Sequence, residues 1–143
     1  MRRFLVVLLL FLSCLPELSF ASEKGVRIEV LTKTVTSWNG DVLPGYPVGQ
    51  PQITVLRIVV PPHTRLPIHK HPVINAGVIL RGRLTVKTLD GKAIHLKAGD
   101  SIVEVVNTWH YGENESDESV ELIVFYAGVK GLPITILEDS KER

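Results

Sequence analysis

Residues 69–82 read His-Lys-His-Pro-Val-Ile-Asn-Ala-Gly-Val-Ile-Leu-Arg-Gly, and this stretch carries the most informative pattern in the chain. Alternate residues of a β-strand point to the same face, so His69 and His71 are expected to present two imidazoles side by side. A third imidazole, from His110 in a later strand pattern, would complete a set on one side of a bound cation. Three nitrogen ligands with an open position are typical of catalytic rather than purely structural metal sites.

Short segments rich in Val, Ile, Leu and Thr recur between turn signals, and helical patterns are almost absent. This spacing is typical of an all-β sandwich or barrel. Asp90-Gly91 is the strongest hairpin signal, because this dipeptide suits a tight turn between two strands. The stretch 37–52 is rich in Gly and Pro and is predicted to be a loop or lid. The predicted strands are residues 26–36, 53–60, 73–80, 84–89, 92–96, 101–106, 120–126 and 133–137.

The N-terminus has the pattern of a secretory signal peptide, residues 1–21. A basic start precedes an unbroken apolar run over residues 4–12, and cleavage is expected after Ala21. The pattern predicts a single mature domain, residues 22–143, that is periplasmic or secreted. The alternative localisation is that of a lipoprotein processed at Cys14.

The charge balance argues against several classes of partner. Without the predicted signal peptide, basic and acidic residues are equal in number. Nothing therefore favours binding to nucleic acid or to an anionic membrane surface. The apolar run is too short for a membrane span, which needs about 20 residues. The only cysteine, Cys14, would leave with the signal peptide, so any metal must be bound by nitrogen and oxygen. A neutral, apolar-rich chain tolerates self-association, and a homodimer is expected.

Two motifs in this chain resemble the two motifs of the cupin superfamily. The first consists of the H-x-H step, Asn75 and Gly82, where cupins typically have Glu at the Asn75 position. The second spans residues 99–114, includes His110, and is similar to the cupin pattern G-x5-P-x-G-x2-H-x3-N. The resemblance covers about residues 53–128. It implies a double-stranded β-helix, which is a small jelly roll or cupin barrel, with a metal inside the barrel mouth.

The resemblance also implies the metal ligands. Carried over residue by residue, they are His69, His71 and His110, and they would hold one divalent transition metal. The candidate metals are Fe, Cu, Zn, Mn and Ni, because imidazole suits several of them. The partner implied by such a site is a small-molecule substrate or ligand.

This chain departs from the cupin pattern at several positions. Asn75 replaces the usual Glu, and it is expected either to bind as a weak oxygen ligand or to act as a catalytic residue that positions water or substrate. Without the carboxylate, the metal would keep its full charge and be a harder Lewis acid. His63 and Asn107 stand where the pattern has Gly. We identify no Asp or Glu within either motif as a general base, which argues against isomerase or lyase chemistry.

Other distinctive side chains have structural interpretations. Asn114 is expected to satisfy backbone groups at a turn. Arg57 lies within an apolar strand and is expected to pair with a carboxylate. His95 alternates with apolar neighbours, so it is expected to point outward from a strand. Trp38 is expected to lie in the core or in a lid.

The sequence favours one function and leaves a second open. The favoured function is that of an exported mononuclear metal-binding cupin, acting as a dioxygenase-like oxidoreductase on a small organic substrate that chelates the metal. The alternative is a non-catalytic module that binds a small ligand or a metal, because fold alone does not decide function.

Overall fold

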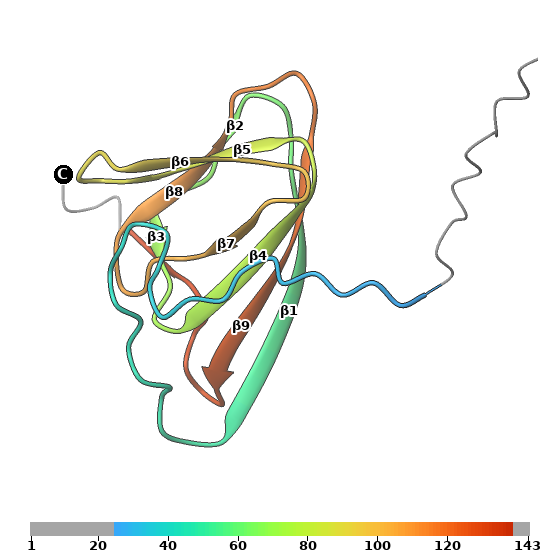
Figure 1. Ribbon diagram of the computed structural model, residues 1–143. Coiled ribbons are helices and arrows are strands. Elements are labelled where there is room, and N and C mark those ends of the chain that lie inside the picture. Colours follow the sequence, from blue (N-terminus) through green and yellow to red (C-terminus); the bar gives the residue numbers. More distant parts are fainter. Residues whose placement is uncertain (1–24, 139–143) are drawn as a thin grey trace, which may run out of the picture.

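The computed structural model describes residues 25–138, which fold into two facing β-sheets (Figure 1). The regular elements of this part of the chain are all strands, so the predicted all-β jelly roll is confirmed. The same residues contain no helix with the length and apolarity needed to cross a membrane. The predicted signal peptide lies outside the described residues.

The first sheet consists of β1 (Pro51–Val60), β4 (Ile74–Arg81), β7 (Ser101–Val103) and β9 (Val120–Val129). These strands are antiparallel and follow the order β1-β9-β4-β7. The β1–β9 pairing is continuous along the full length of both strands, which makes it the longest ladder of the sheet. This sheet carries most of the apolar residues that face the interior.

The second sheet consists of β2 (Thr64–Arg65), β3 (His69–Lys70), β5 (Arg83–Thr88), β6 (Ala93–Lys97), β8 (His110–Asn114) and β10 (Ile136–Leu137). Its order is β10-β3-β8-β5-β6, and β2 also pairs with β8. The predicted hairpin is confirmed, because β5 and β6 pair on either side of the Asp90-Gly91 turn. Gly91 has a φ of 91°, which glycine adopts more readily than other residues.

The core lies between the two sheets. Alternate residues of β4 and β9 are buried, as expected for strands with one face against a core. Val60, Ile79, Val86 and Val120 are each at most 2% exposed and belong to one apolar cluster. Fully burying such a side chain stabilises a fold by about 1.5–3 kcal/mol. This cluster holds the two sheets in the arrangement that positions the site.

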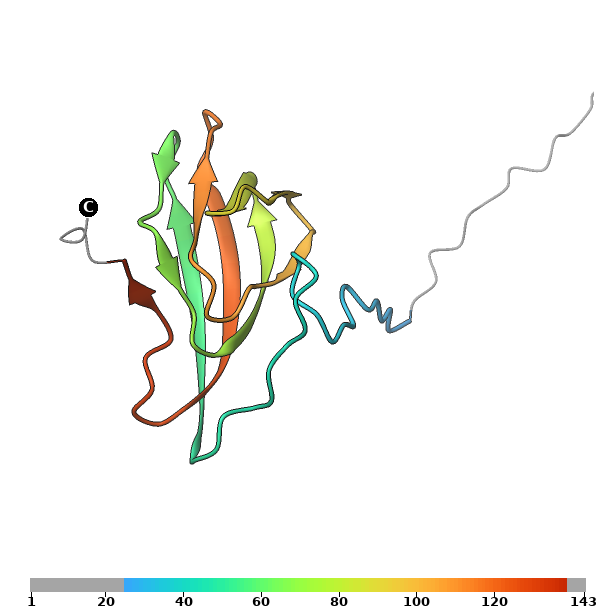
Figure 2. The same cartoon turned by 90° about the vertical axis from the view of Figure 1, so that its left-hand side faces the viewer.

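Residues 26–36 do not form the predicted first strand. Val26, Ile28 and Val30 are 93%, 87% and 72% exposed, and no strand of the described chain pairs with them. The segment has the alternating pattern of a strand, but a strand also needs a neighbour that completes its hydrogen-bond ladder. In Figure 2 the segment leaves the sandwich on the side opposite β10.

The predicted strand 101–106 is shorter than expected, because β7 ends at Val103. Beyond this point the chain crosses from the first sheet to the second, and Val106 forms a parallel bridge with His71. The predicted strand 133–137 is likewise reduced to the two residues of β10. The crossing after β7 brings the second motif next to the first.

Two residues that stand at glycine positions of the cupin pattern keep a left-handed backbone. His63 has a φ of 51° and Asn107 a φ of 56°, and they are the non-glycine residues with positive φ among those described. Asn and His adopt this conformation more often than most residues. The backbone of both motifs is therefore retained although the glycines are not.

Candidate metal centre

Three histidines converge on one cavity between the sheets. His69 in β3 is the register partner of His110 in β8, and His71 follows β3 directly. The centroids of the three rings are 4.5–5.0 Å apart. One ring nitrogen of each histidine lies within 4.8 Å of the corresponding atoms of the other two. The structure thus brings together the three side chains for which metal binding is predicted.

Backbone carbonyls fix the orientation and the tautomer of the three rings. The Nδ1 atoms of His69, His71 and His110 lie 2.7, 2.8 and 2.8 Å from the carbonyl oxygens of Pro67, Ile134 and Thr108. A carbonyl oxygen can only accept a hydrogen bond, so each Nδ1 carries the hydrogen and donates it. Each Nε2 then keeps its lone pair, which is the arrangement that second hydrogen-bond partners impose on metal-binding imidazoles.

Burial favours the neutral form of the three imidazoles. It lowers the pKa of His69, His71 and His110, because the interior disfavours a charged ring. For His71 the pKa falls to about 4, although its hydrogen bond to the Ile134 carbonyl acts in the opposite direction. Metals bind the neutral imidazole, so the three lone pairs are available at neutral pH.

Side chains of the first sheet form the opposite wall of the cavity. Asn75 in β4 is the register partner of Tyr126 in β9. The N–H of Glu104 donates to the carbonyl of Asn75 at 3.1 Å, so these three residues form a row across adjacent strands. All three line the same cavity as the histidines. Asn75 is 1% exposed and lies where the sequence analysis expects it, beside the histidines.

Glu104 is the residue that the sequence analysis missed. It stands inside the second motif, so the statement that neither motif contains a candidate acidic base is wrong. Its side chain is 14% exposed, and its Oε2 atom lies 3.8 Å from Nε2 of His110. Burial raises the pKa of Glu104 to about 7. The sequence did contain a signal, because Glu104 lies two residues after the apolar Ile102, and residues i and i+2 of a strand point to the same face.

Unpartnered polar atoms gather in this cavity. Among residues 25–138, the buried side-chain atoms without a hydrogen-bond partner are Trp38 Nε1, Asn75 Nδ2, Asn75 Oδ1, Glu104 Oε2 and His110 Nε2. All of them except the Trp38 atom belong to residues that line the cavity. Leaving such a group unsatisfied costs about 1–3 kcal/mol. The cavity is therefore built for a polar or charged ligand.

A divalent transition metal fits this donor set. The cavity has a volume of about 60 Å³, and a water molecule occupies about 30 Å³ in the liquid. The space thus admits a metal ion with one or two waters. Neutral imidazoles, a carboxamide and a carboxylate are ligand types that suit Zn, Cu, Fe, Mn and Ni.

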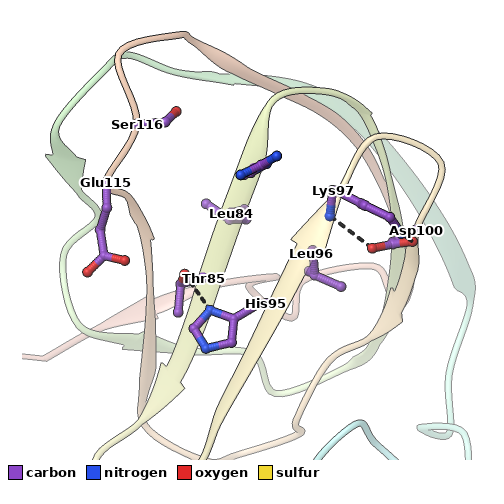
Figure 3. Close-up of a pocket in the computed structure, with 9 residues that line it drawn as sticks. Leu84, Thr85, His95, Leu96, Lys97, Asp100, Glu115 and Ser116 are labelled. Atoms are coloured by element: carbon purple, nitrogen blue, oxygen red, sulfur yellow. Dashed lines mark hydrogen bonds and ion pairs between the residues drawn. The ribbon is translucent and has the colours of Figure 1, made fainter.

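A larger depression on the outer surface offers a weaker set of ligands. It has a volume of about 600 Å³ and lies over β5 and β6 (Figure 3). Its histidine, His95, points outward as predicted, and its Nδ1 lies 3.0 Å from Oγ1 of Thr85. Lys97 donates to Asp100 at 2.8 Å. The residues that line this depression include no second imidazole, so the histidine cavity remains the candidate site.

The structural interpretations of three other residues are confirmed. Asn114 is fully buried, and the two hydrogens of its side-chain amide are shared among three backbone carbonyls, which lie 2.8–3.1 Å from Nδ2. Arg57 pairs with Glu121 on the neighbouring strand β9. Trp38 packs against the apolar core.

Comparison with known proteins agrees with this geometry. The sequence profile of the cupin domain matches residues 56–126, which include the three histidines, Asn75 and Glu104. This chain belongs to the cupin superfamily. No curated protein sequence matches this cupin significantly.

Solved structures resemble this cupin at low sequence identity. A DMSP lyase from Ruegeria pomeroyi superposes with a TM-score of 0.55 at 18% identity, over 64% of this chain and 45% of the lyase chain. An oxalate decarboxylase from Lactobacillus farciminis gives 0.53 at 19% identity, over 59% and 26%. A cupin-like protein from Thermotoga maritima gives 0.52 at 20% identity, over 60% and 64%. This cupin spans less than two thirds of each of these chains, and the similarity establishes the fold alone.

Proposed function

We propose that this protein is an exported mononuclear metal-binding cupin that acts as a dioxygenase-like oxidoreductase on a small organic molecule. The observation that carries the proposal is that one ring nitrogen from each of His69, His71 and His110 lies within 4.8 Å of the other two, in one cavity. Their Nδ1 atoms are hydrogen-bonded to carbonyls, so the Nε2 lone pairs are the ones left to bind a metal.

A divalent transition metal held there would supply Lewis-acid and one-electron chemistry. The side chains of the opposite wall would orient what binds beside it. The Asn75 carboxamide offers a donor and an acceptor, both without partners, to a water or to a substrate oxygen. Burial raises the pKa of Tyr126 to about 12, so its hydroxyl keeps its hydrogen and can act as a donor at neutral pH.

The walls of the cavity limit the substrate to a small molecule. Leu66, Leu84 and Leu122 line the cavity together with the polar groups. A volume of about 60 Å³ admits only a few non-hydrogen atoms beside a metal. A compact molecule with two oxygen donors, able to chelate the metal, suits this space.

The proposal is tested first by metal content. Untagged protein would be recovered from the export compartment without chelators and analysed by mass spectrometry, beside His69→Ala and His110→Ala. We expect near-stoichiometric metal in the wild type and its loss in both variants. Oxygen consumption by the loaded protein with a panel of small chelating acids would then test turnover. Little metal in the wild type, unchanged in the variants, would contradict the proposal.

Metal or ligand binding without turnover is the alternative, and the small volume of the cavity favours it. In that case the protein would retain metal through purification, and the histidine variants would lose it. The loaded protein would consume no oxygen with any acid in the panel, although binding of an acid would displace metal-bound water. Oxygen uptake that requires both metal and substrate would exclude this alternative.

Export is part of the proposal and rests on the pattern of residues 1–21. The intact mass of the recovered protein tests it directly. A chain that begins at Ser22 is expected. A chain that begins at Met1, or a lipid attached to Cys14, would contradict cleavage after Ala21.

A homodimer is also part of the proposal, formed through the outer face of the first sheet. Val55 on β1 and Phe125 on β9 are register partners and are 59% and 42% exposed. Ile53 and Val59 extend this apolar surface along β1, at 54% each. β1 is the edge strand of its sheet, and exposed apolar edges are typically covered in native proteins. A second copy of this chain is the partner that we propose.

A further inference from the structure

We propose that Glu104 supplies the carboxylate ligand that the Asn75 position lacks, so that three imidazoles and one carboxylate bind the metal. The inference rests on the proposed metal site and adds an oxygen ligand from the second motif. With this ligand, the metal would not keep the full charge that the presence of Asn75 in the first motif leads one to expect.

The register of the first sheet places Glu104 one strand away from Asn75. Ala76 pairs with Val103 in the β4–β7 ladder, and the next pair along is Asn75 and Glu104, joined by the hydrogen bond between their backbones. Side chains directly opposite each other in an antiparallel pair point to the same face, with Cβ atoms about 4.5–5.5 Å apart. A carboxylate at position 104 therefore enters the same cavity as one at position 75.

The space between the Glu104 carboxylate and His110 suits a cation. Oε2 of Glu104 and Nε2 of His110 are 3.8 Å apart, and neither has a hydrogen-bond partner. Nδ1 of His110 donates to a carbonyl, so Nε2 presents a lone pair to the carboxylate oxygen. Two acceptors face each other in this arrangement. Two atoms that bind one metal at about 2.0–2.2 Å can be as much as about 4.2 Å apart, so a metal ion fits between them.

Charge balance supports the same assignment. Three neutral imidazoles leave both charges of a divalent ion uncompensated in a buried cavity, which is unfavourable. The carboxylate of Glu104 would halve that charge. The carboxylate also needs a positive charge nearby, because none of the ion pairs within residues 25–138 joins Glu104 to a lysine or an arginine. The positive charge of the metal and the negative charge of the carboxylate would therefore compensate each other.

The test uses Co²⁺ as the probe. The affinity of the protein for Co²⁺ is measured by competition with a coloured chelator, and the coordination of the bound Co²⁺ is followed by visible absorption. Glu104→Gln keeps the size of the side chain and removes the charge. We expect it to weaken Co²⁺ binding at least about tenfold and to change the positions and intensities of the Co²⁺ bands. Glu113→Gln is the matched control, because Glu113 is on β8 and pairs with Lys87 outside the cavity.

A rescue variant separates a ligand from a residue that merely supports the fold. The double variant Glu104→Gln with Asn75→Glu returns the carboxylate to the neighbouring strand. We expect it to recover most of the affinity and a Co²⁺ spectrum close to that of the wild type. A spectrum that stays as in Glu104→Gln would contradict the proposal.

The remaining outcomes distinguish this inference from the proposed site. Wild-type affinity and spectrum in Glu104→Gln, with binding lost in His110→Ala, would overturn the ligand role and leave the three-histidine site intact. Weaker binding with an unchanged spectrum would also overturn it, because the carboxylate would then act outside the coordination sphere. Failure of the wild type to bind Co²⁺ would overturn the proposed site itself.

Discussion

His69 and His110 are direct register partners on β3 and β8, and their ring centroids are 4.5 Å apart. One belongs to the first motif and the other to the second, so pairing of the two strands brings together two of the three histidines of the candidate centre. Because the site exists only when this pairing has formed, a metal that binds it binds the folded chain and not the unfolded one. Metal binding and folding are therefore coupled.

Added metal should raise the thermal stability of the protein. At a free Co²⁺ or Zn²⁺ concentration one hundred times its Kd, we expect a stabilisation of about 2.7 kcal/mol. His71→Ala should abolish this effect, because it removes one of the three nitrogens. His95→Ala is the control, since His95 lies on the outer surface. Calorimetry with and without metal provides the measurement, and an equal shift in His71→Ala would contradict the site.

The metal-free protein should lose stability in mild acid. The pKa values of His69, His71 and His110 are lowered in the folded state, to about 4 for His71. Below the ordinary value of about 6.5, the unfolded state therefore binds more protons than the folded state. The contribution of the histidines is fully present above that pH and is lost as pH falls towards 4. Urea unfolding in chelator between pH 8 and pH 4 measures it.

Glu104 should act in the opposite direction. Its pKa is raised to about 7 in the folded state, so its contribution is full below the ordinary value and is lost as pH rises through 7. In the metal-free protein, the stability of Glu104→Gln relative to wild type should therefore increase from pH 4 to pH 8. The expected change is about 3 kcal/mol. A stability difference that does not vary with pH would count against the raised pKa.

Gly82 should not tolerate a side chain. It has a φ of 80°, and a Cβ added there would lie 2.8 Å from the backbone oxygen of Ser119. Gly82→Ala should destabilise the protein by about 2–4 kcal/mol, because strain and a backbone clash combine. Gly91→Ala is the matched comparison, since Gly91 also has positive φ but its added Cβ would meet nothing within 4 Å. Similar losses in chemical denaturation of both variants would contradict the role of the clash.

Asn114 should hold the turns at the end of the barrel. Its amide donates to the carbonyls of Val60, Pro61 and Glu118. Asn114→Asp keeps the shape of the side chain but replaces the donor with an acceptor, so we expect a loss of about 3 kcal/mol at neutral pH. Protonation of the aspartate should recover part of that loss in acid. Equal stability of the variant and the wild type at pH 7 would exclude this role.

A charge on the outer face of the first sheet should prevent dimer formation. Phe125→Glu places a carboxylate at the centre of the proposed interface, beside Val55. We expect a dimer for the wild type and a folded monomer for the variant in sedimentation experiments. Leu89→Glu is a control with a similarly exposed apolar residue, at 51%, in the β5–β6 turn region. A monomeric wild type would refute the interface.

Local patterns in the sequence were sufficient for His69 and His71 and for most strands, and the resemblance to the second cupin motif added His110. His69 and His71 are two residues apart, so they point to the same face of any β-strand that contains them. This follows from strand geometry alone and does not depend on the rest of the chain. The Asp90-Gly91 turn depends on the conformational preference of two adjacent residues. The structural role of Asn114 at a turn was likewise expected from the hydrogen-bonding chemistry of its own side chain.

Other features were decided only by the tertiary structure, because they depend on which distant segments pair. Residues 26–36 have a strand pattern, but in the described chain Thr36 forms only an isolated bridge with Val42, so no continuous ladder forms. The tautomer of His71 is set by the carbonyl of Ile134, far along the sequence. Glu104 enters the cavity because β7 pairs with β4 in a register that places it opposite Asn75. The sequence determined which side chains are available to bind a metal. The strand register decided which of them meet, because register sets both the neighbour and the face of every residue.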